Sequence, residues 1–181
     1  MSLPRAFDRS ITGQAWRWRG AGGETDDLVT QLLLARGCPP EELEAHRSPT
    51  IRSFMPDPSI FQDMDKAAER LADAVIAGEQ VTIFGDYDVD GACAGALMTR
   101  FLRDLGCQVT PYVPDRIKEG YGPNAPAIAA LCDAGASLVI CVDCGIAAGA
   151  ALAAAEGRAD VVVLDHHKAE GVLPAVLAVV N

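Results

Sequence analysis

A set of acidic and imidazole side chains follows the short apolar runs of this sequence. The set comprises Asp86, Asp88, Asp90, Asp143, Asp165, His166 and His167. Carboxylates gathered in a partly dry cleft repel one another, so they either hold protons or surround a cation. Oxygen ligands with an imidazole favour Mg²⁺ or Mn²⁺ over a metal that prefers thiolate. The candidate ligands outnumber those that one hydrated ion takes from a protein, which predicts two divalent ions.

The chemistry predicted for such a pair of ions is hydrolysis of a phosphoester. Two metal ions lower the pKa of a bridging water, stabilise negative charge on a phosphoryl oxygen and hold the nucleophile in line. The sequence has no G-x-S-x-G segment that would indicate a serine nucleophile, and it has neither a Walker A sequence nor a G-x-G-x-x-G fingerprint. We therefore expect a metal-dependent hydrolase.

Two other interpretations of the acidic run over 86–91 stay open. Asp-x-Asp-x-Asp-Gly also opens an EF-hand calcium loop, but that loop needs a glutamate at its twelfth position, where this chain has Leu97. It also needs a preceding helix, where a strand is predicted here. Acids after a single strand also cap the next helix or stay solvated. Because the pattern repeats after further strands, a shared site is favoured.

The cysteines indicate structural roles. Cys141-x-x-Cys144 is a candidate redox pair, or a zinc site together with the two adjacent histidines. However, Cys141 lies within an apolar run, and strand alternation points it differently from Cys144, so buried thiols are favoured. His46 is expected to be an exposed helix residue. The other cysteines are expected to be small core residues; they are Cys38, Cys93, Cys107 and Cys132.

Apolar runs alternate with helical repeats from about residue 60 onward. The expected strands are Val81–Phe84, Gln108–Val113, Leu138–Val142, Val161–Leu164 and the run Val176–Val180. The expected helices are 62–77, 91–105, 124–134 and 146–156. The alternation predicts an α/β fold, a doubly wound, mostly parallel sheet of Rossmann-like type. Such a sheet binds ligands at the carboxyl ends of its strands, which is where the acidic residues stand.

The N-terminal part has a different pattern. Residues 1–58 are expected to form a small helical appendage, with helices over 26–36 and 41–46, and residues 59–181 to form the main domain. Trp16 and Trp18 are expected in an edge strand rather than as platforms for bases.

Composition limits the function classes. The chain has 181 residues, half of them apolar, and a formal charge of −10. This length supports one sizeable core. No apolar run is long enough to cross a bilayer, and the N-terminal sequence lacks a secretion signal, so we expect a cytoplasmic protein with reduced thiols and no membrane partner. The acidic balance argues against a surface that holds nucleic acid by charge alone. The oligomeric state is not indicated.

Taken together, the motifs resemble the DHH phosphoesterase superfamily. The matching segments are GDYDVDG at 85–91, VDCG at 142–145 and LDHH at 164–167. Within it, the chain is similar to the RecJ family of bacterial 5′→3′ exonucleases specific for single-stranded DNA, which act in DNA repair and recombination. That closer similarity extends over about residues 15–181, and its further segments are 55–58, 63–67, 112–116 and 119–122.

The resemblance implies a division of roles among the candidate residues. His167 would contact the scissile phosphate, and Asp165 would orient the histidines. Arg116, Lys118 and Lys168 are candidate contacts to the phosphates of single-stranded DNA, with solvated loop charges as the open alternative. The implied metal ligands for Mn²⁺ or Mg²⁺ are Asp86, Asp88, Asp90, Asp143 and His166.

Members of this family continue beyond the point where the chain stops, at Asn181. We therefore expect an N-terminal portion that is weakly active or inactive alone, with the basic DNA channel supplied by further domains. One alternative is a DHH enzyme acting on small substrates such as short oligonucleotides, cyclic dinucleotides or pyrophosphate. Another is an interaction module without enzymatic activity.

Overall fold

The computed structural model describes residues 9–15, 27–169 and 171–181. It divides into two units, Met1–Pro56 and Asp57–Asn181, each of which is described by itself. The domain boundary that we predicted after residue 58 stays a prediction. None of the helices in the described ranges has the length and apolar character needed to cross a lipid bilayer.

The second unit is built on a five-stranded parallel sheet in the order β2-β1-β3-β4-β5. Its strands are β1 Gln80–Gly85, β2 Gln108–Tyr112, β3 Leu138–Val142, β4 Asp160–Leu164 and β5 Ala178–Val180. The predicted α/β fold class is therefore confirmed. All of β3 is buried, as expected for a uniformly apolar strand that is covered on both faces.

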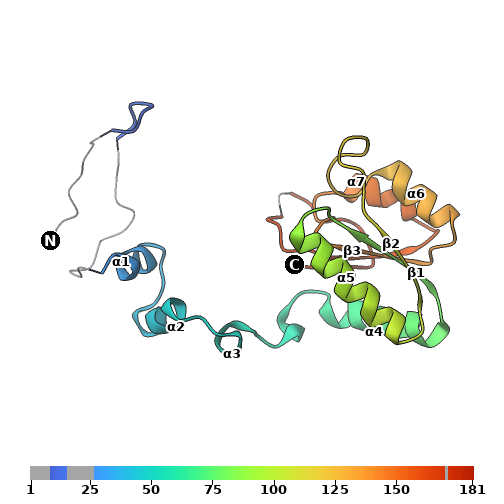
Figure 1. Ribbon diagram of the computed structural model, residues 1–181, viewed down its shortest axis with the longest axis horizontal. Helices are drawn as coiled ribbons and strands as arrows, with labels where there is room; N and C mark the ends of the chain where they lie inside the picture. The colour runs from blue at the N-terminus through green and yellow to red at the C-terminus, as the bar shows by residue number, and fades with distance from the viewer. Residues whose placement is uncertain (1–8, 16–26, 170) are drawn as a thin grey trace. The chain divides into compact units, whose positions relative to one another are not determined.

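Helices cover both faces of this sheet (Figure 1). They are α4 Met64–Ala77, α5 Val89–Asp104, α6 Ala125–Asp133 and α7 Gly149–Leu152; a short 3₁₀ helix, η2 Pro58–Ile60, precedes α4. Neighbouring residues of β1 face opposite layers, as strand alternation requires. Ile83 packs in one core cluster with Leu102 of α5, and Phe84 packs in the other with Ile128 of α6.

The helix predicted over 146–156 is mostly wrong. A loop, α7 and the 3₁₀ helix η3 (Ala153–Ala155) occupy this segment. The chain enters it through Gly145 at φ 111°, and the backbone N–H of Ile146 donates to the Asp165 carboxylate. The alanine-rich sequence has high helix propensity. However, the contact between Ile146 and Asp165 holds the first residues of the segment in a loop, so the helix begins only at Gly149.

The first unit consists of short helices with no core among its described residues, none of which is buried. Asp27 caps α1 by accepting the N–H groups of Val29 and Thr30, and Gly37 at φ 85° follows its end. Its helices are α1 Leu28–Ala35, η1 Pro40–Glu42, α2 Leu43–Arg47 and α3 Ile51–Phe54. The last of these was not predicted. Trp16 and Trp18 lie outside the described residues.

The cysteines agree with the predicted structural role in part. Cys107, Cys141 and Cys144 are buried. Cys93 is exposed on α5, so its assignment to the core was wrong: it lines an open cavity instead of packing in a core cluster. The thiols of Cys38 and Cys132 are half-buried.

Candidate metal centre

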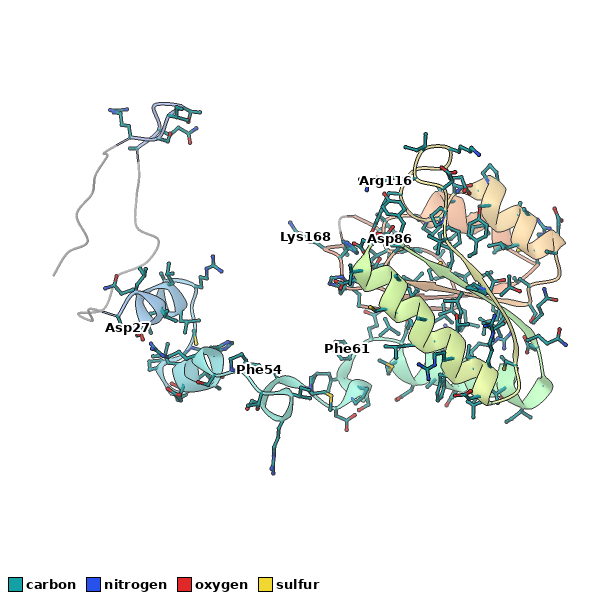
Figure 2. The ribbon with its side chains drawn as sticks, in the orientation of Figure 1. Asp27, Phe54, Phe61, Asp86, Arg116 and Lys168 are labelled. Carbon is teal, nitrogen blue, oxygen red and sulfur yellow. The ribbon has the colours of Figure 1, made fainter. Side chains whose placement is uncertain are left out.

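Three strands end at the same level, and an aspartate follows each of them. The last residues of β1, β3 and β4 are paired in register, and the next residues are Asp86, Asp143 and Asp165. The chain reverses its direction of winding between β1 and β3, because β2 lies on one side of β1 and the later strands lie on the other. Ligands bind at this kind of switch point in doubly wound folds. In Figure 2, Asp86, Arg116 and Lys168 are at this end of the unit.

Asp86, Asp88 and Asp143 form the first ligand group, in which one carboxylate oxygen from each lies within 4.8 Å of the others. Asp86 is buried, and its Oδ1 accepts the Tyr87 N–H at 2.7 Å. Asp88 caps α5 by accepting the Gly91 N–H at 3.0 Å. That hydrogen bond is the main reason why the pKa of Asp88 lies below its ordinary value, so this carboxylate stays charged.

The loop that carries these acids depends on Gly91. A Cβ at this position would lie 2.6 Å from both the carbonyl oxygen and the Cβ of Asp86. Real Cβ atoms do not approach this closely, so only glycine lets the first turn of α5 pack against the end of β1. The glycine that closes the GDYDVDG motif therefore has a steric role.

Asp143, His166 and His167 form the second ligand group, which shares Asp143 with the first. Asp143 has a left-handed backbone, at φ 59°, and its Oδ1 lies 2.9 Å from His166 Nε2. Its buried Oδ2 has no hydrogen-bond partner among the described residues. Burial and the charge of Asp88 raise the pKa of Asp143, despite the bond to His166. A buried carboxylate oxygen without a partner, on the residue that both groups share, fits a bound cation.

Asp165 forms hydrogen bonds to both histidines from a buried position. Its side chain is 1% exposed, and its Oδ1 accepts the backbone N–H groups of His166 and His167 at 2.8 and 3.1 Å. Its Oδ2 accepts the Ile146 N–H. Burial acts to raise the pKa of Asp165, but these hydrogen bonds and the one from His167 outweigh it and lower the pKa.

The imidazole of His167 is held by the same carboxylate. Its Nδ1 lies 2.7 Å from Asp165 Oδ1, so Nδ1 carries a proton and Nε2 is directed away from Asp165. The hydrogen bond to Asp165 is the main reason why the pKa of His167 lies above its ordinary value. The imidazole is thereby biased towards the charged form, which donates hydrogen bonds from both nitrogens.

Asp90 belongs to neither ligand group found among the described residues. It is exposed in the first turn of α5 and lines a cavity of about 700 Å³ together with Asp143, Asp165 and His166. The walls of this cavity also include apolar side chains of α4, α5 and β4, among them Met64, Leu97 and Leu164. The structure thus brings Asp90 to the same cavity as His166, but its carboxylate joins neither group of possible ligands found among the described residues.

The candidate phosphate contacts have different surroundings. The Arg116 guanidinium lies over the ring of Tyr87, 4.8 Å from its centroid, which keeps it next to the acidic loop. Lys118 is exposed and pairs with Asp115 at 3.8 Å. Lys168 is exposed and directly follows His167.

Sequence reasoning assigned no role to Tyr121. Its hydroxyl donates to the Asp143 carbonyl oxygen at 3.3 Å and lies 3.4 Å from His167 Nε2. Burial, followed by the nearby carboxylates, raises the pKa of Tyr121, so the phenol stays protonated. The signal was the segment Glu-Gly-Tyr-Gly at 119–122, in which both flanking glycines adopt positive φ and present the tyrosine on a tight loop.

The doubly wound sheet and the Asp–His cluster at its switch point agree with the family that the sequence matches. Residues 80–181 match the DHH family, N-terminal domain. The chain belongs to the DHH family.

The curated relatives that it matches are RecJ proteins. It is 41% identical over 155 residues to the single-stranded-DNA-specific exonuclease RecJ of Bacillus subtilis, covering 85% of this chain and 20% of the relative. It is 33% identical over 161 residues to the RecJ of Escherichia coli, covering 87% of this chain and 27% of the relative. The chain therefore spans about a fifth to a quarter of the length of these relatives.

The solved structures that are similar to this chain are also RecJ structures. A crystal structure of exonuclease RecJ bound to manganese is similar with a TM-score of 0.59 and 35% identity, covering 62% of this chain and 29% of the other. The crystal structure of Thermus thermophilus RecJ in complex with Mn²⁺ is similar with a TM-score of 0.54 and 32% identity, covering 64% of this chain and 16% of the other.

Proposed function

We propose that this chain carries the metal-binding part of an exonuclease that hydrolyses phosphodiester bonds of single-stranded DNA in the 5′→3′ direction, in DNA repair and recombination. The observation that carries the proposal is the position of Asp143, which belongs to both ligand groups and has a buried oxygen without a hydrogen-bond partner among the described residues. The RecJ relatives support the substrate, because their names specify single-stranded DNA.

The proposed metal ligands are Asp86, Asp88, Asp90, Asp143 and His166, which would hold two Mn²⁺ or Mg²⁺ ions. Their donor set of carboxylate oxygens and one imidazole suits these ions, and both similar RecJ structures contain manganese. When bound, such ions supply a water of lowered pKa and neutralise charge on the phosphoryl oxygens. Asp143 would bridge the two positions.

His167 is proposed to stabilise the charge that develops on the scissile phosphate. Asp165 holds the proton on Nδ1 and raises the pKa of the imidazole, so Nε2 is available to donate to a phosphoryl oxygen. Asp165 is a positioning residue, because its buried carboxylate is occupied by hydrogen bonds to the chain itself.

The proposed contacts to DNA outside the scissile phosphate are Arg116, Lys118 and Lys168. Arg116 is the best placed of them, because its guanidinium is fixed over Tyr87 beside the acidic loop. With a net charge of −10, the chain as a whole repels DNA, so backbone contacts must come from such local cations or from further parts of the protein.

The proposal is tested by following the release of nucleotides from 5′-labelled single-stranded and duplex oligonucleotides by the full-length protein with Mn²⁺. We expect single-strand-specific activity that falls by about a thousandfold in Asp143→Asn, because the residue shared by both metal positions loses its charge. Asp104→Asn, an exposed acid at the far end of α5, is the matched control and should change nothing.

Two results would contradict this proposal. One is unchanged hydrolysis by Asp143→Asn. The other is a wild-type protein that ignores DNA but cleaves cyclic dinucleotides or pyrophosphate, which would favour the small-substrate alternative.

A further inference from the structure

The first unit contains a second cluster of possible metal ligands, separate from the acidic residues of the sheet. Cys38, Glu42 and His46 each offer one ligand atom, and these atoms lie within 4.8 Å of one another. The cluster combines a thiol, a carboxylate and an imidazole, and consecutive members are four residues apart. This spacing is within the range found between neighbouring zinc ligands.

The backbone fixes the positions from which these side chains project. At the end of α1, the N–H of Gly37 donates to Leu34 and the N–H of Cys38 donates to Leu33, with Gly37 at φ 85°. This is the Schellman arrangement, which orders the residue after the glycine. Glu42 and His46 lie one helical turn apart at α2 and so project from the same side.

A second contact holds α1 and α2 together. Arg47 of α2 pairs with the Asp27 carboxylate at the start of α1 and donates to the Thr30 hydroxyl at 2.9 Å. His46 lies next to Arg47 in sequence, and its ring is 4.8 Å from that of Phe54, a residue labelled in Figure 2. The cluster therefore sits on a connected part of the unit.

The distance between the imidazole and the carboxylate agrees with that around a tetrahedral zinc ion. Bonds of about 2.0–2.3 Å at tetrahedral angles place two ligand atoms about 3.3–3.7 Å apart. His46 Nε2 and Glu42 Oε2 are already 3.6 Å apart. The Cys38 thiol donates only a weak hydrogen bond, to the Pro39 carbonyl oxygen at 3.6 Å, and this bond would be given up when the thiolate binds metal.

The chemistry of the three side chains favours a zinc-class ion. A thiolate with an imidazole suits Zn²⁺, whereas Mg²⁺ and Mn²⁺ prefer oxygen ligands. Partial burial, followed by the negative charges of Glu42 and Glu41, raises the pKa of Cys38, so without a cation the thiol stays protonated. Binding of a divalent metal would release this proton to solvent and offset the negative charge of Glu42.

A metal link between α1 and α2 would also supply stability that this unit lacks. None of its described residues is buried, so hydrophobic burial contributes little to its stability. Small units without a core are commonly stabilised by a disulfide or a structural metal. The plain alternative is a surface ion pair between Glu42 and His46 beside an unrelated thiol, and such pairs contribute little.

We propose that Cys38, Glu42 and His46 bind one zinc-class metal ion that links the end of α1 to α2, with a water in the fourth position. This site differs from the acidic centre of the sheet in ligand chemistry and in metal preference.

The first test uses Co²⁺ as a spectroscopic probe on the full 181-residue chain, reduced with a phosphine and presaturated with Mn²⁺. A sulfur-to-cobalt charge-transfer band should appear, saturate at one equivalent and disappear when Zn²⁺ is added. Cys38→Ser should abolish the band, and His46→Ala should weaken Co²⁺ binding by about tenfold or more. Cys93→Ser, which changes an exposed cysteine of α5, is the matched control and should keep the band.

The second test measures amide hydrogen exchange over residues 28–47 with and without Zn²⁺. At a zinc concentration about a hundred times the Kd, opening that breaks the site should become about 100-fold rarer, and exchange should slow to match. Cys38→Ser should remove this protection. The proposal is overturned if the wild-type chain gives no thiolate band, if the band persists in Cys38→Ser, or if zinc leaves exchange in α1 and α2 unchanged.

Discussion

At the scale of single residues, the candidate centre depends on a contrast between two buried aspartates. Asp165 has its carboxylate filled by hydrogen bonds from the chain, which lower its pKa against the effect of burial. Asp143 keeps one buried oxygen without a partner among the described residues, and its pKa is raised. The first is suited to orient its neighbours and the second to receive a cation. The same residue type therefore serves two roles, which its surroundings decide.

The role of Asp165 is tested by Asp165→Asn. Loss of the carboxylate should lower the pKa of His167 towards its ordinary value, since the bond to Asp165 is what raises it. If charged His167 donates to the phosphate, activity is lost as pH rises through this pKa, and the falling limb of the pH profile should move to lower pH. We expect kcat to fall by about 10- to 100-fold at saturating Mn²⁺.

The measurements are an NMR titration of His167 and single-turnover hydrolysis as a function of pH. A thermal melt of the same variant shows whether the fold is intact. An unshifted pH profile together with a lowered pKa of His167 would exclude this histidine as the charged donor.

Tyr121 gives a smaller and separable prediction. Tyr121→Phe keeps the ring but removes the hydroxyl that lies between the Asp143 carbonyl and His167. Loss of one such hydrogen bond is worth about 0.5–1.5 kcal/mol, so we expect kcat to fall by about 2- to 10-fold. Mn²⁺ affinity, measured by calorimetry, should not change. A large loss of metal binding would instead make the hydroxyl part of the metal site.

The acids of the centre were predictable from the sequence, but their detailed arrangement was not. Asp86 and Asp143 follow apolar strands, and parallel pairing necessarily brings such positions to one edge. Asp90 shows the limit, because the direction of its carboxylate depends on how the first turn of α5 meets β1. Tyr121 was missed because it lies on a loop, where no periodic pattern reports which way a side chain points.

At the scale of secondary-structure elements, the centre depends on how closely α5 approaches the end of β1. Gly91 and Gly95 lie one turn apart in this helix, but their surroundings differ. A Cβ at Gly91 would meet the Asp86 backbone at 2.6 Å, whereas a Cβ at Gly95 would meet only Val142 Cγ2, at 3.9 Å. The two positions therefore form a matched pair for mutation.

We predict opposite effects of alanine at these two positions. Gly91→Ala should displace the acidic loop, destabilise the fold by about 1–3 kcal/mol and weaken Mn²⁺ binding. Gly95→Ala should leave Mn²⁺ binding unchanged and raise stability by about 0.5–1 kcal/mol, because alanine is the better helix former. Urea unfolding and Mn²⁺ calorimetry on both variants check this. Equal Mn²⁺ affinities would show that the close contact does not position the ligands.

Local sequence patterns explain which secondary-structure elements could be predicted. The strands and α4, α5 and α6 were found because their apolar periodicity reflects burial. The segment 146–156 was mistaken for one helix because alanine content was the only local signal. Its loop is set by a hydrogen bond from Ile146 to Asp165, and a contact over 19 residues of sequence leaves no local pattern.

At the scale of the whole sheet, the end opposite the candidate metal centre is held by its own ionic network. Arg70 of α4 donates to both oxygens of Glu79, at 3.1 and 2.7 Å, and to Asp160 at the start of β4. Ser137, just before β3, also donates to Glu79. This network joins α4 to the starts of three strands. The two ends of the sheet therefore differ: one is held by this ionic network, and the other carries the candidate metal ligands.

The network predicts a dependence of stability on pH. Hydrogen bonds from Arg70 and then from Ser137 lower the pKa of Glu79. A carboxylate with a lowered pKa in the folded state stabilises the protein above its unfolded pKa, about 4.3, and loses this contribution as pH falls through the folded value. The Glu79 contribution should therefore be complete at neutral pH and decline below about pH 4.

Glu79→Gln isolates this contribution. The variant leaves Arg70 partly buried, with a neutral partner in place of the carboxylate, so we expect a loss of about 1–3 kcal/mol at pH 7 and a smaller loss at pH 3. Glu69→Gln, an exposed glutamate of the same helix region, should have little effect at either pH. Urea unfolding at both pH values measures the difference.

Because Glu79 lies at the opposite ends of the strands from Asp86, Mn²⁺ affinity should be the same in both variants. A loss of metal binding in Glu79→Gln alone would mean that the two ends of the sheet are coupled.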